Sequence, residues 1–397
     1  MITQDYPYID KRILLEAKTL ARAGFEVSIL SPLPFSEKGC EDAGVIFLSV
    51  ATEKKTAGGF IIKTKDRLRE MFPGWLYPTA KRLFFSIKSA DFIPYKKEMV
   101  KAAMDYAPDI CFAHDLPALP IARDAVSGTG ALIVYDSHEF FIGQHAVRGK
   151  RRRFFEHMEK ECIGAAGLML TVNDEIADIF NEKYGIRPKT IQNASECGAA
   201  PSRKDLQELL NIPANKKIVL YQGALHEGRN LEVLVEMAGN LPEDIVVVFI
   251  GTGFLKNKLK KKAGAGGLLG KKAFFIDGVS FCEVVSYTAG ADAGMVPYTA
   301  IDLNTKFCTP NKLYEYISAR VPIIENSDLV SVGRLIDRYK IGICADFTDP
   351  GRLAVEITDF LASAGLAKLK ENMGKAAAVL SWEQEGKKLI SYLNEAL

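Results

Sequence analysis

Short apolar runs alternate along the chain with longer stretches in which apolar side chains recur every three to four residues. Residues 10–23 show this helical spacing, and Gly24 then provides a typical helix end. Further helices are predicted at 174–184, 230–240, 310–319 and 381–396. The apolar runs that predict strands are 27–30, 110–113, 132–135, 167–172, 218–221, 246–250, 274–276, 293–296 and 322–324.

Strands that alternate with helices in this way favour parallel sheets with helices on both faces, an α/β fold. The chain is long enough for two such domains. A loop-like stretch near 193–205 predicts the boundary, which gives domains at 1–197 and 198–380. Because ligands of parallel sheets bind beyond the carboxyl ends of the strands, we expect a ligand in a central cleft between the domains.

Composition narrows the class of protein without indicating an activity. Apolar residues make up 48% and charged residues 25% of the 397 residues, which is ordinary for a soluble globular protein. The net charge of +2 makes no case for nucleic-acid binding. No apolar run approaches the roughly 20 residues that span a bilayer, and the polar N-terminus argues against secretion. Seven scattered cysteines without a CxxC pair predict reduced thiols and no zinc site.

The stretch 309–316 carries the most specific chemistry in the chain. Thr309 before Pro310 predicts an N-cap followed by the first helical residue. The free amides of such a helix start bind anions, and Lys312 adds a full charge there. Glu315 follows one turn later and could accept hydrogen bonds from a ribose. This combination indicates a nucleotide-sugar site, although an ordinary capped helix with solvated charges fits the same stretch.

Many short segments, in order along nearly the whole chain, resemble the family 4 glycosyltransferases of the GT-B type, which have two Rossmann-like domains. Each segment alone is weakly specific, but their common order is a strong signal. The segments are 10–13, 16–17, 20–27, 108–110, 113–115, 134–139, 171–173, 191–193, 221–225 with Arg229, 249–253, 287–292, 310–316 and 322–324.

The resemblance implies transfer of a sugar from a nucleotide-diphosphate donor to an acceptor hydroxyl, with retention at the anomeric carbon. The chain has no Asp-x-Asp triplet, so we expect neither a metal nor a cofactor. Fixed positive charge and helix amides must then stabilise the leaving diphosphate. The family pattern assigns Arg229, Asn311 and Lys312 to the diphosphate, Glu315 to the ribose, and Gly223 to close approach of the donor.

Two histidines follow predicted strands of the first domain. The resemblance implies that His114 orients the donor sugar or stabilises charge, with general base catalysis as a lesser option. His138 is expected on the acceptor side, where Glu139 could pair with it. A structural hydrogen-bonding role for His138 is an equal alternative. The resemblance also implies that the C-terminal helix, residues 381–397, packs back on the first domain.

The sequence departs from the family pattern at several positions. Phe307 stands where many members have a glutamate that contacts the donor sugar, and Arg320 stands where a glycine is usual. Ala224 and Asn230 replace basic residues, which leaves Arg229 with more of the phosphate charge. The first strand is reduced to residues 1–3, so it is either short or preceded by an upstream start.

A basic, aromatic segment marks the predicted acceptor domain. Residues 60–101 carry ten Lys or Arg against four acids, interleaved with aromatic side chains, and a second basic run spans 148–153. Basic amphipathic helices of this kind suit an anionic membrane surface. A solvated helix face with its aromatic residues in the core is the alternative.

The sequence therefore predicts a cytoplasmic glycosyltransferase of the hexosyltransferase type, peripheral on the inner membrane leaflet. Its expected partners are a nucleotide-sugar donor and a glycan or glycolipid acceptor, such as a lipid-linked precursor of a bacterial surface polysaccharide. Nucleic acid is excluded as a partner. Two alternatives stay open: a non-catalytic GT-B protein that binds a nucleotide sugar or a partner, and a GT-B nucleotide-sugar epimerase.

Overall fold

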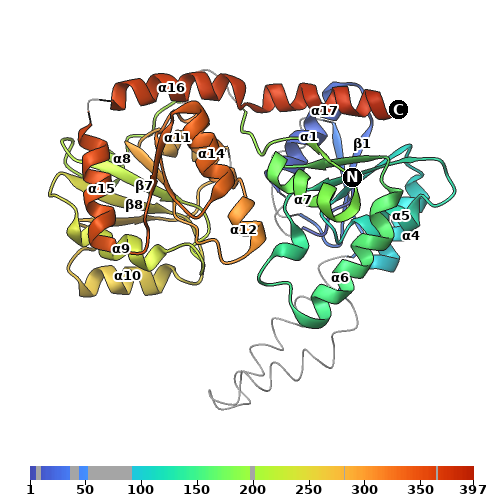
Figure 1. The fold of residues 1–397 in the computed structure, drawn as a ribbon, viewed down its shortest axis with the longest axis horizontal. Helices are drawn as coiled ribbons and strands as arrows, with labels where there is room; N and C mark the ends of the chain where they lie inside the picture. Colours follow the sequence, from blue (N-terminus) through green and yellow to red (C-terminus); the bar gives the residue numbers. More distant parts are fainter. Residues whose placement is uncertain (6–9, 36–43, 52–91, 197–201, 281, 364) are drawn as a thin grey trace, which may run out of the picture. The chain divides into compact units, whose positions relative to one another are not determined.

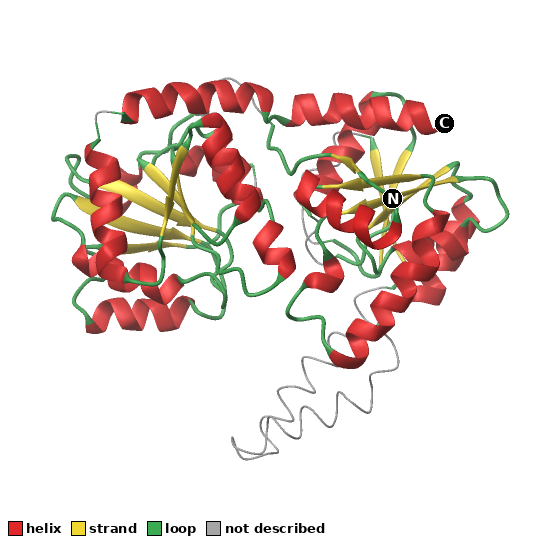
Figure 2. Ribbon diagram, viewed as in Figure 1, coloured by secondary structure: helices red, strands yellow, loops and turns green. Residues whose placement is uncertain are grey.

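The computed structural model describes residues 1–5, 10–35, 44–51, 92–196, 202–280, 282–363 and 365–397. The chain forms two compact units, whose helices and strands are drawn in Figures 1 and 2. Unit 1 comprises Met1–Ile142, Val147–Leu170 and Ile390–Leu397. Unit 2 comprises Gly143–Ala146 and Thr171–Leu389.

Strands and helices alternate through both units. In the first half of the chain they are α1 (Lys11–Arg22), β1 (Val27–Ser31), β2 (Val45–Ser49), α4 (Lys96–Tyr106), β3 (Ile110–His114), α5 (Leu119–Ala125), β4 (Leu132–Ser137), α6 (Gly149–Cys162), β5 (Leu168–Thr171), α7 (Asp174–Tyr184) and β6 (Lys189–Thr190). Two 3-10 helices, Phe141–Gly143 and Ile163–Ala165, flank α6. In the second half they are α8 (Leu206–Leu210), β7 (Lys217–Gln222), α9 (Leu231–Asn240), β8 (Ile245–Ile250), α10 (Lys256–Ala265), β9 (Ala273–Ile276), α11 (Val284–Thr288), β10 (Ala293–Val296), α12 (Leu303–Phe307), α13 (Asn311–Ser318), β11 (Ile323–Asn326), α14 (Val330–Tyr339), β12 (Gly342–Ala345), α15 (Pro350–Ala362), α16 (Leu366–Val379) and α17 (Trp382–Ala396).

A single residue joins two groups of parallel strands in unit 1. β1 pairs with β2, and β3 pairs with β4, which β5 follows in the sheet. Ile2 forms isolated parallel bridges to Leu30 of β1 and Ala113 of β3. The resulting order, β2-β1-Ile2-β3-β4-β5, is that of a doubly wound sheet with Ile2 in the central position. In the described residues this central position is occupied by the single bridging residue Ile2.

Unit 2 contains a six-stranded sheet of order β12-β11-β10-β7-β8-β9, in which every neighbouring pair is parallel. The order reverses between β7 and β10, and in doubly wound sheets the ligand crevice lies beyond the carboxyl ends of the strands at such a reversal. All six residues of β8 are buried, as expected for a strand covered on both faces.

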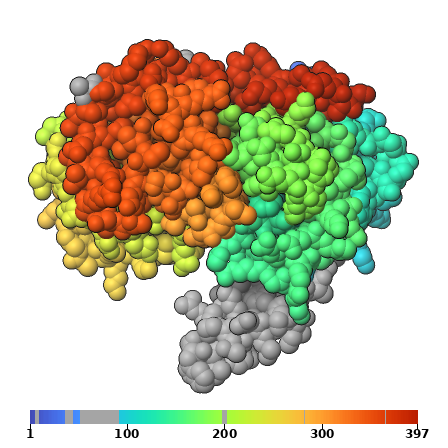
Figure 3. All heavy atoms as spheres, in the orientation of Figure 1, coloured from blue at the N-terminus to red at the C-terminus, as the bar shows by residue number. Residues whose placement is uncertain are grey.

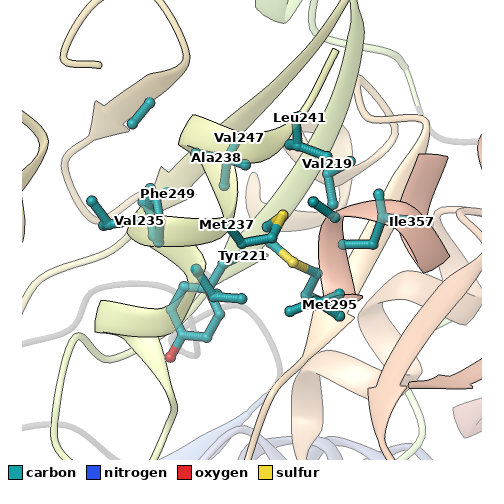
Figure 4. Packing of buried hydrophobic residues seen from close by; sticks show 14 of the residues in the cluster. Val219, Tyr221, Val235, Met237, Ala238, Leu241, Val247, Phe249, Met295 and Ile357 are labelled. Carbon is teal, nitrogen blue, oxygen red and sulfur yellow. The ribbon is translucent and has the colours of Figure 1, made fainter. Parts of the chain in front are cut away.

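Apolar side chains on both faces of this sheet form the core of unit 2. Val219, Val247 and Phe249 point to one face, where α9 and α15 cover them, while Leu220 and Val248 point to the other. Figure 4 shows the first face, on which Tyr221, Met237 and Met295 lie together. Helices α15 and α16 lie at the surface of unit 2, and Figure 3 shows their atoms in orange and red.

The predicted fold class and the predicted strands and helices are confirmed, with differences of at most two residues at their ends. The predicted start of the 310–319 helix is wrong in detail. Pro310, not Thr309, is the N-cap, because its ψ of 151° is extended, and Asn311 is the first helical residue. Arg320 adopts a φ of +59°, so it takes the left-handed conformation that favours glycine.

Within the described residues, no helix is long and apolar enough to cross a membrane. Most of the predicted basic segment, residues 60–91, lies outside the described residues, whereas the basic run at 148–153 begins α6. The predicted boundary between residues 197 and 198 remains a prediction.

Candidate functional site

Three elements of unit 2 meet beyond the carboxyl ends of β7 and β10. Gly223 directly follows β7, Tyr298 lies two residues beyond β10, and Lys312 lies in the first turn of α13. This is the position at which a doubly wound sheet binds ligands. The structure therefore brings together four of the predicted residues, Gly223, Arg229, Lys312 and Glu315, through the contacts described below.

The floor of this crevice is main chain packed on main chain. Gly223 adopts a φ of +118°, and its amide donates to the carbonyl of Ile250 at 2.9 Å. A Cβ atom on Gly251 would lie 2.0 Å from the carbonyl oxygen of Gly223, and one on Gly253 would lie 2.4 Å from that of Leu225. Only glycine fits these positions, so the loops after β7 and β8 approach each other as bare backbone.

Lys312 places an ammonium group between two aromatic rings. Its Nζ lies 3.9 Å from the ring centroid of Tyr221 and 4.8 Å from that of Tyr298. The residue is only 5% exposed, and Nζ makes no hydrogen bond to any part of the chain that the structure describes. Burial lowers the pKa of Lys312 well below its usual range, and the nearby Arg229 adds to the effect. A buried cation without a hydrogen-bond partner is ready to receive an anion.

Arg229 lies on the same aromatic pair. Its guanidinium carbon is 4.5 Å from the ring centroid of Tyr298, and its Nη1 donates to the Tyr298 hydroxyl. A Cβ atom on Gly223 would lie 3.2 Å from Nζ of Lys312, so the bare loop and the ammonium adjoin. Two positive side chains and an exposed backbone turn thus share one small volume, which suits a diphosphate.

Glu315 lies one turn further along α13 and is half-buried. One of its carboxylate oxygens accepts from Nε2 of Gln222 at 2.6 Å, and the Gln222 amide oxygen in turn accepts from the Thr288 hydroxyl. This chain of hydrogen bonds fixes the Glu315 carboxylate against the end of β7. The other carboxylate oxygen is the one that could accept from a ligand hydroxyl.

The start of α13 offers main-chain donors beside Lys312. The amide of Leu313 bonds to the carbonyl of Pro310 at 2.9 Å, so the first-turn amides of Asn311 and Lys312 precede the helix hydrogen-bond ladder. An anion at this helix start would gain from the amides and from the helix dipole.

A network of buried charges lies at the carboxyl ends of β3 and β4 in unit 1. Arg12 forks onto Asp136, with Nε and Nη2 at 2.8 and 2.7 Å from the two carboxylate oxygens. Arg12 Nε also lies 3.0 Å from Glu16 one turn along α1. Burial disfavours the charge of Asp136, but Arg12 outweighs it and holds the pKa of that carboxyl well below its usual range. Burial and Asp136 raise the pKa of Glu16 well above its usual range.

Both predicted histidines join this network. Nδ1 of His114 lies 3.2 Å from Nε2 of His138, which lies 2.9 Å from Asp136. Burial lowers the pKa of His114 to about 4, so its imidazole is neutral. Burial opposes the charged form of His138 as well, but Asp115 and Asp136 outweigh it and raise the pKa of His138 to about 10. His138 is thus an imidazolium at neutral pH.

Asp115 is the member of the network that reaches solvent. Its side chain is 26% exposed, against 1% for that of His114. It accepts from the backbone amide of His138 at 3.0 Å, while its own backbone is held at a φ of +61°. Strained residues of this kind cluster at functional sites. Burial raises the pKa of Asp115 to about 8, against the effect of His138.

Sequence reasoning missed several partners. Asp115 and Asp136 pair with His138 and were not predicted. The suggested pairing of His138 with Glu139, whose backbone carbonyl accepts from Ser137, stays a prediction. The Tyr221 and Tyr298 rings around Lys312 were also missed. An aromatic residue within two positions of each central strand end is the sequence signal that could have found them.

His114, Asp136 and His138 offer atoms close enough together to be tested as a metal site. Both oxygens of Asp136 already accept from Arg12, and His138 carries a proton that it shares with Asp136. A cation would meet a guanidinium and an imidazolium at the same carboxylate. The donor set therefore fits a hydrogen-bonded network better than a metal centre.

Known proteins match the part of the chain that contains β7, β10 and α13. Residues 202–379, which include the whole crevice of unit 2, match the family model described as "Glycosyl transferases group 1". The putative teichuronic acid biosynthesis glycosyltransferase TuaC of Bacillus subtilis is 22% identical over 340 residues, which cover 82% of this chain and 78% of TuaC.

Solved structures resemble the chain over almost its whole length. Sucrose-phosphate synthase of Thermosynechococcus elongatus superposes with a TM-score of 0.73 at 14% identity, covering 99% of this chain and 97% of that one. Alr3699/HepE of Anabaena, solved in complex with UDP and glucose, gives 0.72 at 13%, covering 99% and 98%. The fold is GT-B. The family match and the TuaC relative further support a glycosyltransferase of this fold.

Replacing Lys312 by Met should raise the stability of the unliganded protein. The change removes a buried cation without a hydrogen-bond partner, a gain of about 1–4 kcal/mol by analogy with buried ion pairs replaced by apolar residues. Because the folded pKa of Lys312 is lowered, the native chain should gain stability as pH rises toward 10.5, and K312M should lack this gain. Urea midpoints at several pH values test this, with K261M on the exposed face of α10 as the control. A K312M protein less stable than the native one contradicts the assignment.

Replacing His138 by Gln should remove a second pH dependence. The pKa of His138 is raised from 6.5 to about 10, so its contribution is complete below pH 6.5 and is lost as pH rises toward 10. The difference in unfolding free energy between the native chain and H138Q should therefore shrink over that range. The exposed His157, on α6, provides the control variant H157Q. A difference that stays constant from pH 6.5 to 10 would show that His138 is not charged in the folded protein.

Proposed function

We propose that the chain is a metal-independent, retaining glycosyltransferase of family 4. It transfers a hexosyl group from a nucleotide-diphosphate sugar to an acceptor hydroxyl. The acceptor is a lipid-linked or surface-polysaccharide precursor, and the reaction takes place on the cytoplasmic side of the membrane. The teichuronic acid assignment of TuaC supports this class of acceptor.

The observation that carries the proposal is the buried ammonium of Lys312. It lies in an aromatic cage beside Arg229 and the bare turn at Gly223, at the start of α13. A protein that served only as a scaffold would gain stability by replacing this lysine with an apolar residue. Retention of an unpaired buried cation is the expected signature of an anion site, and a diphosphate provides the two negative groups that two cations need.

The chemistry follows from these charges. The bond between the anomeric carbon and the diphosphate oxygen breaks, and a bond from the same carbon to the acceptor oxygen forms on the same face. The acceptor proton passes to the departing phosphate oxygen, so no separate base is required. Lys312 and Arg229 stabilise the charge that develops on the leaving group, the role that a metal ion fills in other transferases.

The site gives Lys312 a further property. Burial lowers the pKa of Lys312 in the unliganded protein, and the opposite charge of a bound diphosphate would raise that pKa again. Glu315, fixed by Gln222, accepts from the ribose hydroxyls. Donor recognition thus combines the charge of Lys312 with a carboxylate that is already held in position.

In unit 1, His114 acts as a neutral hydrogen-bonding group. Its Nε2 is buried and makes no hydrogen bond to the described residues, so it is available to a sugar hydroxyl. Burial lowers the pKa of His114 to about 4, which favours the neutral, hydrogen-bonding role over the role of a cation. His138, paired with Asp115 and Asp136, holds His114 in place and keeps the acceptor side polar.

The first part of α6 supports a site for an anionic lipid surface. Arg148, Lys150, Arg151, Arg152 and Arg153 are all exposed. Arg151 also stacks on the rings of Phe141 and Phe155, at 6.0 and 5.7 Å from their centroids. A basic face over aromatic residues gains about 1 kcal/mol per Lys or Arg near an anionic bilayer.

A thermal-shift panel of nucleotide diphosphates and diphospho-sugars, with and without magnesium, tests the donor site. One nucleotide should raise the unfolding midpoint in the absence of magnesium. At about 100-fold excess over its Kd, the nucleotide should raise the free energy of unfolding by about 2.7 kcal/mol. K312M should abolish the shift and K261M should keep it. Donor hydrolysis or transfer by the same sample separates the enzyme from a non-catalytic binder. Release of an epimerised free sugar nucleotide would indicate the epimerase instead.

Flotation with vesicles tests the lipid surface. The protein should float with vesicles that contain about one third anionic phospholipid and should stay at the bottom with neutral ones, since the attraction is electrostatic. Exchange of Lys150 and Arg153 for Glu should reduce binding, whereas exchange of Lys258 and Lys262 on α10 should not. Equal binding to neutral vesicles would contradict the proposal.

A further inference from the structure

Cys308 lies in the short segment that joins α12 to α13 and has no part in the reaction proposed above. It comes two residues before Pro310, the N-cap of α13, and four residues before Lys312. The residue is partly exposed. Its sulfur lies near the charged groups of the crevice, since it exerts an electrostatic effect on Arg229, Tyr298 and Lys312.

Hydrogen bonds fix the main chain on both sides of Cys308. The carbonyl of Phe307 accepts from Nδ2 of Asn173 at 2.8 Å. The carbonyl of Thr309 accepts from Nδ2 of Asn193 at 3.3 Å. The thiol is therefore held at the start of α13, beside the two cations of the crevice.

These cations favour an anionic sulfur at this position. The thiolate is the nucleophilic form of cysteine, and a neighbouring Arg or Lys or a helix N-terminus stabilises it. Arg229 is a permanent cation. The Lys312 ammonium is 5% exposed and has no hydrogen-bond partner within the described residues, so an anion at this place would compensate its charge.

Three other cysteines of the described chain have surroundings that disfavour a thiolate. Cys111 and Cys162 are buried, and burial raises the pKa of both thiols. Cys344 is exposed, but its sulfur donates to Oε1 of Glu325 at 2.9 Å. Partial burial and this carboxyl raise the pKa of Cys344 to about 12. Exposure alone therefore does not make a reactive thiol in this chain, and Cys308 differs by its cationic neighbours.

We propose that Cys308 is a modification site, at which a small disulfide that carries carboxylate groups forms a mixed disulfide with the chain. The Cys308 thiolate attacks one sulfur of the reagent, and the bond between the two reagent sulfurs breaks. A new S–S bond joins Cys308 to one half of the reagent. The other half leaves as a thiolate, which takes up the proton that Cys308 lost. The carboxylates of the attached half pair with Arg229 and Lys312, so the site selects anionic reagents.

The modification closes the donor site reversibly. The attached group fills the space at the start of α13 and engages the two cations that the diphosphate needs. A small thiol releases it by the same exchange in reverse. This effect on the donor rests on the proposed function, whereas the selective reaction of Cys308 does not.

The first test measures how fast each cysteine of the reduced full chain reacts with glutathione disulfide, by mass spectrometry of its peptides. Cys308 should react about tenfold faster than the exposed Cys282 and Cys344, because cations favour its thiolate. Loss of a cation in R229Q should slow Cys308 by about tenfold, whereas K261Q, on the exposed face of α10, should not. With the neutral bis(2-hydroxyethyl) disulfide, the preference for Cys308 should be smaller.

The second test uses the nucleotide-dependent thermal shift. Treatment with glutathione disulfide should remove the shift of the native chain, and dithiothreitol should restore it. The shift of C308S should be the same with and without the treatment, which excludes an effect through another cysteine.

The two tests fail in different ways. A Cys308 that reacts no faster than Cys282, or that reacts equally with anionic and neutral disulfides, overturns the assignment of the site. A modified chain that keeps its full nucleotide shift overturns the closure of the donor site. If the untreated chain shows no shift with any nucleotide, the proposed function fails, while the reaction rates still decide whether Cys308 is the modification site.

Discussion

Arg12 and Asp136 form the buried ion pair on which the carboxyl edge of unit 1 depends. The two groups come from α1 and β4 and meet through two hydrogen bonds of 2.7 and 2.8 Å. Once Asp136 is ionised at the centre of this edge, its charge influences the pKa values of the neighbouring groups. His138 becomes an imidazolium, the pKa of Glu16 rises, and His114 stays neutral beside two cations. Removal of either partner would leave a buried charge without compensation.

Unit 2 treats buried charge in the opposite way. The neighbours of the Lys312 ammonium are aromatic rings, whereas the neighbour of the Asp136 carboxylate is a guanidinium. Within the described residues, no anion forms a hydrogen bond with the Lys312 ammonium. The unliganded protein therefore gives up stability at the place where a ligand would restore it. This difference separates the two sites chemically, because one is a completed network and the other is half of an ion pair.

Much of the fold could be predicted from the sequence because the local spacing of apolar residues specifies most strands and helices. The run at 246–250 and the helical spacing at 10–23 each specify one element, and β8 and α1 occupy those residues. Lys312 and Glu315 were found because they share one helical turn. The partners were missed because Arg12 and Asp136 are 124 residues apart, and no local pattern joins them. The error at Thr309 has the same origin, since the extended ψ of Pro310 is not encoded by Thr-Pro alone.

The contact between the loops at Gly223 and Gly251 limits how this protein can change over time. Since a single added carbon would collide with backbone there, the floor of the crevice has no side chain that substitution could alter. Side chains can vary next to this backbone contact, as at Phe254, which is 64% exposed and whose ring lies 4.7 Å from that of His226. The backbone contact is thus the part that substitution cannot change, and the Phe254 and His226 rings are the part that it can.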